Sequence, residues 1–269
     1  MTGPVDRTAE IRGIRLHYFD WGNEAAPPMV LHHGFRSIRH VWHEVAEHYR
    51  DRFHVLAYDA RGHGESDWDP KHEYSIESYA EDLGAFAKDL RLQPFILVGH
   101  SMGAGVALEF AGTQPTAVAR LVLEDGASSP VPTRAVEPPE SFASWAEAEA
   151  HQLRLMRNGR LPQDVLDREL RRLFKEEGGR VVWRDDMHAL FQHLPGISEA
   201  RAQELAAAVK CPTLLIQAGV NPVLSTETIE GMKSRNSLMH SMTIEGSTHD
   251  VHRSQLQPYL AALDGFLSS

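Results

Sequence analysis

The sequence predicts an α/β fold in which helices cover both faces of a mostly parallel sheet. The main observation is that short apolar runs typical of buried strands alternate with helical patterns over residues 29–125 and again from residue 211 onward. This alternation is typical of a parallel sheet with both faces covered. The second observation is a break in the pattern over residues 127–208, which indicates an insertion.

The expected elements follow in chain order. The chain opens with a β-meander, in which Glu10–Ile11 is followed by a turn at Arg12-Gly13 and by an alternating strand over Ile14–Phe19. Apolar runs predict strands at 29–34, 53–59, 95–98, 121–125, 211–218 and 238–245. Apolar residues at steps of three and four predict helices at 41–49, 75–90, 104–111 and 255–267.

The insertion begins after Asp125, with a stretch rich in Pro, Ser and Thr over 127–139. Amphipathic patterns then predict helices at 142–157, 162–177 and 186–194. We therefore expect a core built from residues 1–126 and 209–269, and a helical cap over 127–208 inserted after the sixth strand. The cap should lie over the C-terminal edge of the sheet, where open α/β sheets bind ligands.

Composition excludes several classes of protein. The net charge of −10 over 269 residues argues against a nucleic-acid partner, because such binding depends on neutralising phosphates. Cys211 is the single cysteine, so an intrachain disulfide and a cysteine-based zinc site are excluded. No apolar run is long enough to cross a membrane, and the N-terminus has no secretory pattern. We expect a cytoplasmic monomer or homodimer that acts on a small molecule, with no membrane partner.

The segment Gly99–Gly103 reads Gly-His-Ser-Met-Gly between a predicted strand and a predicted helix. In this setting a G-x-S-x-G motif forms a sharp turn that holds the serine in a strained backbone conformation with its hydroxyl exposed. Side chains at the two glycines would collide with the neighbouring strand and helix. The motif predicts a nucleophilic Ser101, against the alternative of a plain strand-to-helix turn.

Four motifs in order resemble the α/β-hydrolase fold. They are His33-Gly34, the run Asp59-x-Arg61-Gly62-x-Gly64-x-Ser66, the Ser101 turn, and Thr248-His249-Asp250. The resemblance extends over nearly the whole chain and implies a serine hydrolase without cofactor or metal. It also implies that the glycine-rich run is a structural turn, and that run lacks the residues of a nucleotide-binding loop.

A serine hydroxyl needs a base, and the resemblance points to His249, with His252 as the alternative. The carboxylate that usually orients this base follows the penultimate strand, but Asn221 occupies that position here. Some members of the fold take the acid from the strand after the nucleophile helix, which in this chain ends at Asp125. We therefore expect Asp125 to be the acid, against the alternative that it only caps the strand.

Two other carboxylates near these positions are weaker candidates. Glu124 should alternate to the opposite face of the strand, and Asp250 should point away from the neighbouring imidazole. His32, His33 and His100 adjoin the same loops, and we interpret them as packing or loop-bonding residues.

The resemblance also places the oxyanion donors and the pocket. The backbone N–H groups of Phe35 and Met102 are expected to form the oxyanion hole. Arg36 follows directly and either is solvated at the cap boundary or binds a substrate carboxylate. Apolar cap side chains are possible pocket walls, although most should form the core of the cap; Trp145 and Met187 are our candidates for substrate contact.

The leading functional hypothesis is a serine hydrolase of the carboxylesterase or amidohydrolase type, which acts through an acyl-enzyme. Its triad layout is similar to that of the (E)-2-(acetamidomethylene)succinate hydrolases, which cleave an amide. Ester, thioester, lactone and amide carbonyls are all open to this chemistry. Two alternatives are a cofactor-independent ring-cleaving dioxygenase of the same fold, and a non-catalytic ligand receptor in which Asn221 marks loss of activity.

Overall fold

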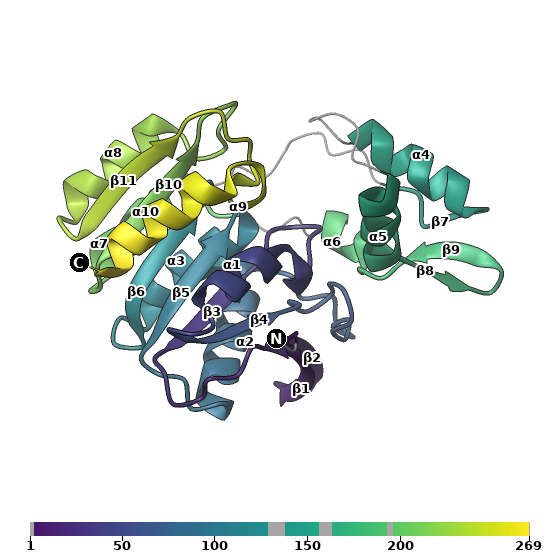
Figure 1. Cartoon of the computed structure of the whole chain (residues 1–269), viewed down its shortest axis with the longest axis horizontal. Helices are drawn as coiled ribbons and strands as arrows, with labels where there is room; N and C mark the ends of the chain where they lie inside the picture. Colours follow the sequence, from purple (N-terminus) through teal and green to yellow (C-terminus); the bar gives the residue numbers. More distant parts are fainter. Residues whose placement is uncertain (1–2, 129–137, 156–162, 193–195, 269) are drawn as a thin grey trace.

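The computed structural model describes residues 3–128, 138–155, 163–192 and 196–268 (Figure 1). Its core is an eight-stranded sheet with the order β1-β2-β4-β3-β5-β6-β10-β11. β1 and β2 pair antiparallel, as do β2 and β4, and the remaining neighbours pair parallel. The mostly parallel sheet predicted from the sequence is confirmed. The strands are β1 (Val5–Ile11), β2 (Ile14–Asp20), β3 (Pro28–His32), β4 (His54–Tyr58), β5 (Phe95–His100), β6 (Val118–Glu124), β10 (Thr213–Ala218) and β11 (Met239–Ile244).

Helices cover both faces of this sheet, as expected. Alternate residues of β5 face opposite sides: Phe95 and Leu97 belong to one apolar cluster, and Ile96 and Val98 to another. The first cluster lies under α2 (Ile76–Asp89), α3 (Met102–Thr113), α7 (Glu199–Ala208) and α8 (Thr226–Arg235). The second lies under α1 (His43–Tyr49) and α10 (Leu256–Ser268). Two short helices, η1 (Arg39–Trp42) and α9 (Val251–Ser254), precede α1 and α10.

Two of these helices were not singled out by apolar periodicity. α7 and α8 are weakly amphipathic, but a serine caps each of them, because Ser198 and Ser225 accept from the N–H groups of Arg201 and Thr228. These capping serines are the sequence signal that could have located both helices. α7 packs against α3 and α8.

The insertion has its own small core and is not wholly helical. It contains α4 (Trp145–Leu155), α5 (Gln163–Leu173), α6 (Met187–Gln192) and a three-stranded antiparallel sheet with the order β7-β9-β8. The strands are β7 (Ser141–Phe142), β8 (Phe174–Glu177) and β9 (Arg180–Trp183). Figure 1 shows these elements grouped on one side of the core, with α6 nearest to it.

The helix predicted over 162–177 is therefore wrong at its C-terminal end. Residues 174–177 form β8 because Gly178 and Gly179 adopt left-handed φ values of 57° and 74° and turn the chain into a hairpin with β9. Phe142, predicted to begin a helix, instead pairs with Val181 in the same sheet. The Gly-Gly pair is the local signal for this hairpin.

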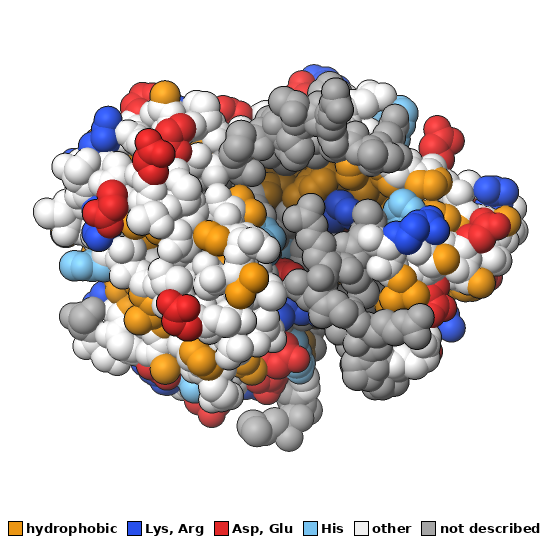
Figure 2. Space-filling model, turned by 90° about the horizontal axis from the view of Figure 1, so that it is seen from above, with side chains coloured by type: hydrophobic (Ala, Val, Ile, Leu, Met, Phe, Trp, Pro, Cys, Tyr) orange, Lys and Arg blue, Asp and Glu red, His pale blue; other side chains and the backbone are white. Residues whose placement is uncertain are grey.

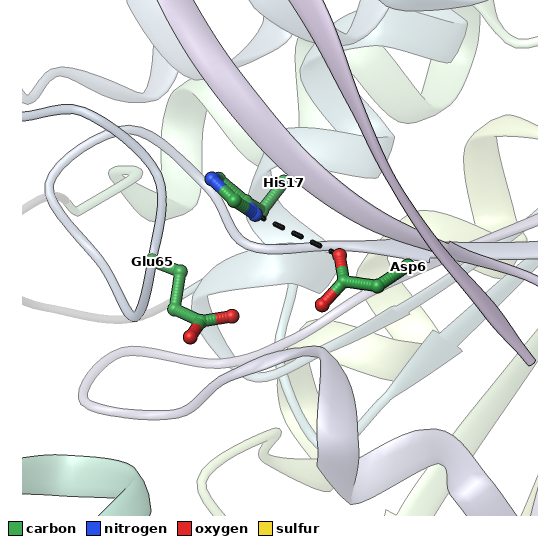
Figure 3. A group of neighbouring side chains, drawn as sticks. All are labelled: Asp6, His17 and Glu65. Atoms are coloured by element: carbon green, nitrogen blue, oxygen red, sulfur yellow. Dashed lines mark ion pairs between the residues drawn. The ribbon is translucent and has the colours of Figure 1, made fainter.

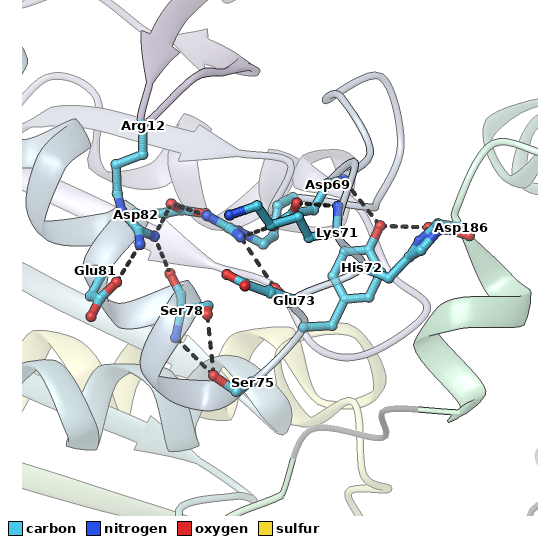
Figure 4. A network of polar contacts seen from close by, with 12 residues as sticks. Arg12, Asp69, Lys71, His72, Glu73, Ser75, Ser78, Glu81, Asp82 and Asp186 are labelled. Atoms are coloured by element: carbon cyan, nitrogen blue, oxygen red, sulfur yellow. Dashed lines mark hydrogen bonds and ion pairs between the residues drawn. The ribbon is translucent and has the colours of Figure 1, made fainter.

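The cap is joined to the core through the segment that leads into α6. The N–H of Asp186 donates to the carbonyl of Gly62 at 2.8 Å, and the N–H of Gly64 donates to Asp185 at 2.8 Å. Tyr74 donates its hydroxyl to Asp186 at 2.6 Å. Figure 4 shows this network extending from Asp186 past His72 to Asp69 and Asp82 of the core. The glycine-rich turn thus has a structural part in holding the cap.

Within the described part of the chain, no helix is long and apolar enough to cross a membrane.

Candidate active site

Ser101 lies at the sharp turn between β5 and α3. Its φ of 54° and ψ of −117° are rare for a residue with a side chain, so the predicted strain is confirmed. A Cβ atom at Gly99 would overlap the backbone of Gly103, and one at Gly103 would overlap the carbonyl of His32. The two glycines therefore permit the close contact that keeps the turn sharp.

His249 lies in the loop between β11 and α9 and contacts both other members of the predicted triad. Its Nε2 is 2.8 Å from the Ser101 hydroxyl oxygen, and its Nδ1 is 2.7 Å from Oδ2 of Asp125. A carboxylate only accepts hydrogen bonds, so Nδ1 carries the proton and Nε2 is left to accept from the serine. The structure thus brings Ser101, His249 and Asp125 into one hydrogen-bonded chain.

Asp125 is fully buried at the end of β6 and has a left-handed φ of 39°. Its carboxylate accepts the backbone N–H groups of Ala218, Val223 and Leu224 at 3.3, 3.1 and 3.2 Å. These donors come from the end of β10 and from the loop that contains Asn221. This loop, where the family resemblance would place the acid, supplies backbone donors to Asp125.

The electrostatics of the pair follow from these bonds. Burial lowers the pKa of His249, but the hydrogen bond and charge of Asp125 outweigh burial and leave the pKa above its ordinary value. Burial raises the pKa of Asp125, but the bonds from His249 and from the backbone of Val223 outweigh it and leave the pKa lowered. Both shifts favour an imidazolium beside a carboxylate, which is the charge state that follows proton transfer from the serine.

The predicted oxyanion donors belong to the residue after Ser101 and to a loop whose Gly34 approaches Ser101. Met102 is the first residue of α3, so its N–H has no acceptor within the helix. A Cβ atom built on Gly34 would lie 3.1 Å from Cβ of Ser101, which places Phe35 one residue after the closest approach of this loop. The Phe35 ring packs against Phe191 of α6, 5.6 Å between centroids, and so touches the cap.

The histidines beside these loops bond to the backbone, as we interpreted them. Nδ1 of His32 is 2.9 Å from the carbonyl of His33, and Nδ1 of His33 is 2.8 Å from that of Gly34. Nε2 of His100 is 2.9 Å from the carbonyl of His249. These bonds fix the two loops that flank Ser101.

A second buried carboxylate–histidine pair adjoins the first, and the sequence did not predict it. Glu124 faces the side of the sheet opposite to Asp125, as expected, and accepts from Nδ1 of His252 at 2.8 Å and from its backbone N–H at 3.0 Å. The His252 ring stacks on Trp42 at 4.3 Å. The carbonyl of Glu124 also accepts the N–H of Ser101 at 2.9 Å. One residue thus bonds to both the nucleophile turn and the helix after His249.

The three candidate substrate contacts lie at different places. Trp145 donates to Glu176 and lies under the guanidinium of Arg171, and Met187 is buried in the cap cluster. The contacts found among the described residues do not link either side chain to Ser101. Arg36 is half-buried beside Trp183 of the cap, at 5.8 Å from its ring. Met156, a further possible wall residue, lies outside the described residues.

A group that could hold a metal ion lies apart from the triad. Side-chain ligand atoms of Asp6, His17 and Glu65 lie within 4.8 Å of one another, and Figure 3 shows the three side chains converging from β1, β2 and the loop after β4. The buried Arg39 bonds to both carboxylates, with Asp6 at 2.8 Å. Arg39 also bonds to the buried Asp59, so a single guanidinium lies among three carboxylates and the group forms part of an ion-pair network in this structure.

The sequence matches the α/β hydrolase fold family over residues 27–252, and the chain belongs to this family. It is 29% identical to the sn-1-specific diacylglycerol lipase ABHD11 of Mus musculus, over 97% of this chain and 87% of that protein. It is 28% identical to the N-formylmaleamate deformylase of Pseudomonas putida, over 95% of this chain and 93% of that protein. These relatives are hydrolases.

Among solved structures, (E)-2-(acetamidomethylene)succinate hydrolase superposes with a TM-score of 0.82 and 22% identity, covering 99% of this chain and 100% of that one. At this identity the likeness concerns the fold. This likeness agrees with the α/β-hydrolase fold that the four sequence motifs indicate.

Proposed function

We propose that this protein is a serine hydrolase that cleaves a small-molecule ester or amide through an acyl-enzyme. The observation that carries the proposal is the continuous hydrogen-bonded chain from Ser101 through His249 to Asp125. A serine hydroxyl is a poor nucleophile by itself, and an adjacent base oriented by a carboxylate activates it.

In the acylation step, each residue of the triad and each oxyanion donor has a separate role. The Ser101 oxygen attacks the substrate carbonyl carbon while its proton passes to Nε2 of His249. The resulting imidazolium is stabilised by Asp125 through Nδ1–H, and the N–H groups of Phe35 and Met102 stabilise the oxyanion. The tetrahedral intermediate then expels the alcohol or amine, which takes the proton from Nε2.

Deacylation repeats the sequence with water. His249 takes a proton from water, and the hydroxide attacks the acyl carbon. The bond to the Ser101 oxygen then breaks, and Nε2 returns the proton to that oxygen. The products are a carboxylic acid and free enzyme. The relatives support this chemistry, because their names describe a lipase and a deformylase.

The test is labelling by a fluorophosphonate, which reacts with activated serines. We expect one covalent adduct per chain, lost in Ser101→Ala and kept in Ser234→Ala, which removes an exposed hydroxyl on α8. Hydrolysis of short p-nitrophenyl esters should be lost in Ser101→Ala and in His249→Ala.

Other outcomes support the two alternatives. Oxygen uptake with an aromatic substrate that survives Ser101→Ala would favour the ring-cleaving dioxygenase. Binding of a small molecule without labelling or turnover would favour the receptor. Either result would contradict the proposed hydrolase.

A further inference from the structure

We propose that Arg36 binds a carboxylate of the substrate, so that the preferred substrates are esters or amides of acyl chains that carry a second acid group. This inference rests on the proposed hydrolase function, because it places the anion beside the same nucleophile. It adds a specificity-determining residue to the site and names a class of substrate.

The backbone positions Arg36 close to the reacting serine. It comes two residues after Gly34, whose Cβ position is 3.1 Å from Cβ of Ser101, and directly after the expected oxyanion donor Phe35. Its φ of 56° is left-handed, a conformation that side chains rarely adopt. The tight loop thus holds the base of an arginine side chain beside the space where an acyl group would bind.

Among the described residues, no hydrogen bond or ion pair joins the guanidinium of Arg36 to a protein group, unlike those of two other arginines of the same region. Its Nε is buried without a hydrogen bond, and across the described residues it has no carboxylate within ion-pair distance. Arg39 bonds to Asp59 and two further carboxylates, and Arg61 bonds to Asp82. Leaving a buried charged donor unpaired is costly, and an anionic ligand would remove that cost.

The side chain of Arg36 reaches across the boundary between the core and the cap. Its guanidinium carbon is 5.8 Å from the ring of Trp183, and His151 of α4 packs against the same ring at 5.8 Å. Nε2 of His151 is also buried without a partner. Two nitrogen-bearing side chains with unmet hydrogen-bonding capacity therefore flank one aromatic ring.

Asp185 is the nearby carboxyl group that could have neutralised Arg36. Its Oδ1 accepts the N–H of Gly64, while its Oδ2 is buried without a partner. Burial raises the pKa of Asp185 to about 7, so near neutral pH it provides only a partial negative charge. Among the described residues no hydrogen bond or ion pair joins Asp185 to Arg36, so the planar fork of Arg36 is open to a carboxylate that binds through two parallel hydrogen bonds.

Figure 2 shows one face of the molecule, on which hydrophobic side chains of described residues gather beside a Lys or Arg side chain. An apolar wall beside a cation suits an acyl chain that ends in a carboxylate.

The experiment compares two ethyl esters that share a four-carbon acyl chain: monoethyl succinate, which carries a carboxylate, and ethyl butyrate, which does not. We expect the wild-type protein to prefer monoethyl succinate. Arg36→Gln should lower the ratio of the two kcat/KM values about 10- to 100-fold, because the charged hydrogen bonds act on one ester only. Arg36→Lys keeps the charge but lacks the planar guanidinium, so its ratio should lie between those of the wild type and Arg36→Gln.

Arg52→Gln is the matched control, because Arg52 is a half-exposed arginine paired with Asp264 on the surface. It should leave the ratio unchanged. An equal loss on both esters in Arg36→Gln, or a wild-type protein without preference for monoethyl succinate, would overturn the inference.

A binding measurement separates this inference from the proposed function. Calorimetry with succinate on the Ser101→Ala variant should give a Kd that rises about 10- to 100-fold when Arg36→Gln is added and does not change with Arg52→Gln. If esters are hydrolysed independently of Ser101, the proposed function fails while this measurement still tests Arg36. If succinate does not bind, or binds equally to all variants, the carboxylate subsite fails while the hydrolase can stand.

Discussion

Among individual residues, Asp125 is the acid of the proposed triad. The position after the penultimate strand carries Asn221, which is exposed and has a left-handed φ of 49°. The loop continues past it to present two backbone N–H groups, those of Val223 and Leu224, to the buried carboxylate. A carboxylate that accepts several N–H bonds stays ionised, and an ionised Asp125 can stabilise the imidazolium of His249.

Asp125→Asn is expected to lower kcat for ester hydrolysis about 10³- to 10⁴-fold, because an amide can hold the imidazole in the wrong tautomer and cannot balance its charge. Asn221→Asp alone should change kcat little, and in the double variant it should restore part of the loss. The measurement is steady-state kinetics on all three variants. Full activity of Asp125→Asn would show that the acid lies elsewhere.

The pH dependence of kcat/KM reports the same pair. The proposed reaction needs neutral His249, so kcat/KM should rise with pH as the imidazole loses its proton. The raised pKa of His249 puts the midpoint of this rise above 6.5, the ordinary value for histidine. In Asp125→Asn the residual activity should have its midpoint at lower pH, because the stabilising charge is gone. An unchanged midpoint would contradict the assignment of Asp125 as the partner of His249.

At the scale of elements, the ends of β5 and β6 organise the site. β5 runs into a turn so tight that α3 starts directly at Met102. β6 ends in two successive carboxylates that face opposite sides, and each takes one histidine from the segment after β11: Glu124 takes His252, and Asp125 takes His249. The period-two alternation of a strand thus anchors both ends of the loop that carries the base.

The turn can be tested with one substitution made at two glycines. Gly103→Ala should lower the free energy of unfolding by at least about 2 kcal/mol, because the new methyl group would overlap the carbonyl of His32. Gly265→Ala, in α10 with open space around it, should raise that free energy by about 0.4–1 kcal/mol. Chemical denaturation measures both. If both substitutions changed the free energy of unfolding equally, the close contact between Gly103 and His32 would not contribute to stability.

At the scale of the molecule, the cap is a separate cluster of apolar side chains held by a short segment. Phe142, Phe174 and Trp183 belong to its core, while Ala189 and Leu190 of α6 belong to the main core. The polar bonds at Asp185 and Asp186 join the same segment to the glycine-rich turn. Among the described residues, the position of the insertion relative to the core therefore depends on few contacts.

Two Tyr→Phe substitutions test this junction. Tyr74→Phe removes the hydroxyl that donates to Asp186 and accepts the N–H of Asp69, and it should lower the free energy of unfolding by about 1–3 kcal/mol. Tyr58→Phe removes a buried hydroxyl that has no hydrogen-bond partner in the described part of the chain, so it should be neutral or slightly stabilising. Urea denaturation compares the two, and limited proteolysis should cut within the cap sooner in Tyr74→Phe. If Tyr74→Phe changed neither the free energy of unfolding nor the rate of proteolysis, the bond between Tyr74 and Asp186 would not hold the cap.

Many of the strands and helices could be predicted from short segments of the sequence. Apolar runs and helical spacing located the parallel strands and α1, α2 and α10, since these elements bury regular faces. The periodicity did not reveal β8 and β9, because Phe174–Trp183 follows an amphipathic helix without a break and its Gly-Gly turn is the only marker. The pairing of Glu124 with His252 could not be predicted, because it joins residues 128 positions apart.

The sequence by itself determined the class of fold and the nucleophile turn, because strand periodicity and the steric needs of Gly99 and Gly103 are properties of short segments. Only the tertiary structure decided which partner each buried charge has: Asp125 pairs with His249, Arg39 pairs with Asp59, and Arg36 pairs with no carboxylate of the described residues. The physical reason is that ion pairs and hydrogen bonds act over a few ångströms between residues that only the folded chain brings together.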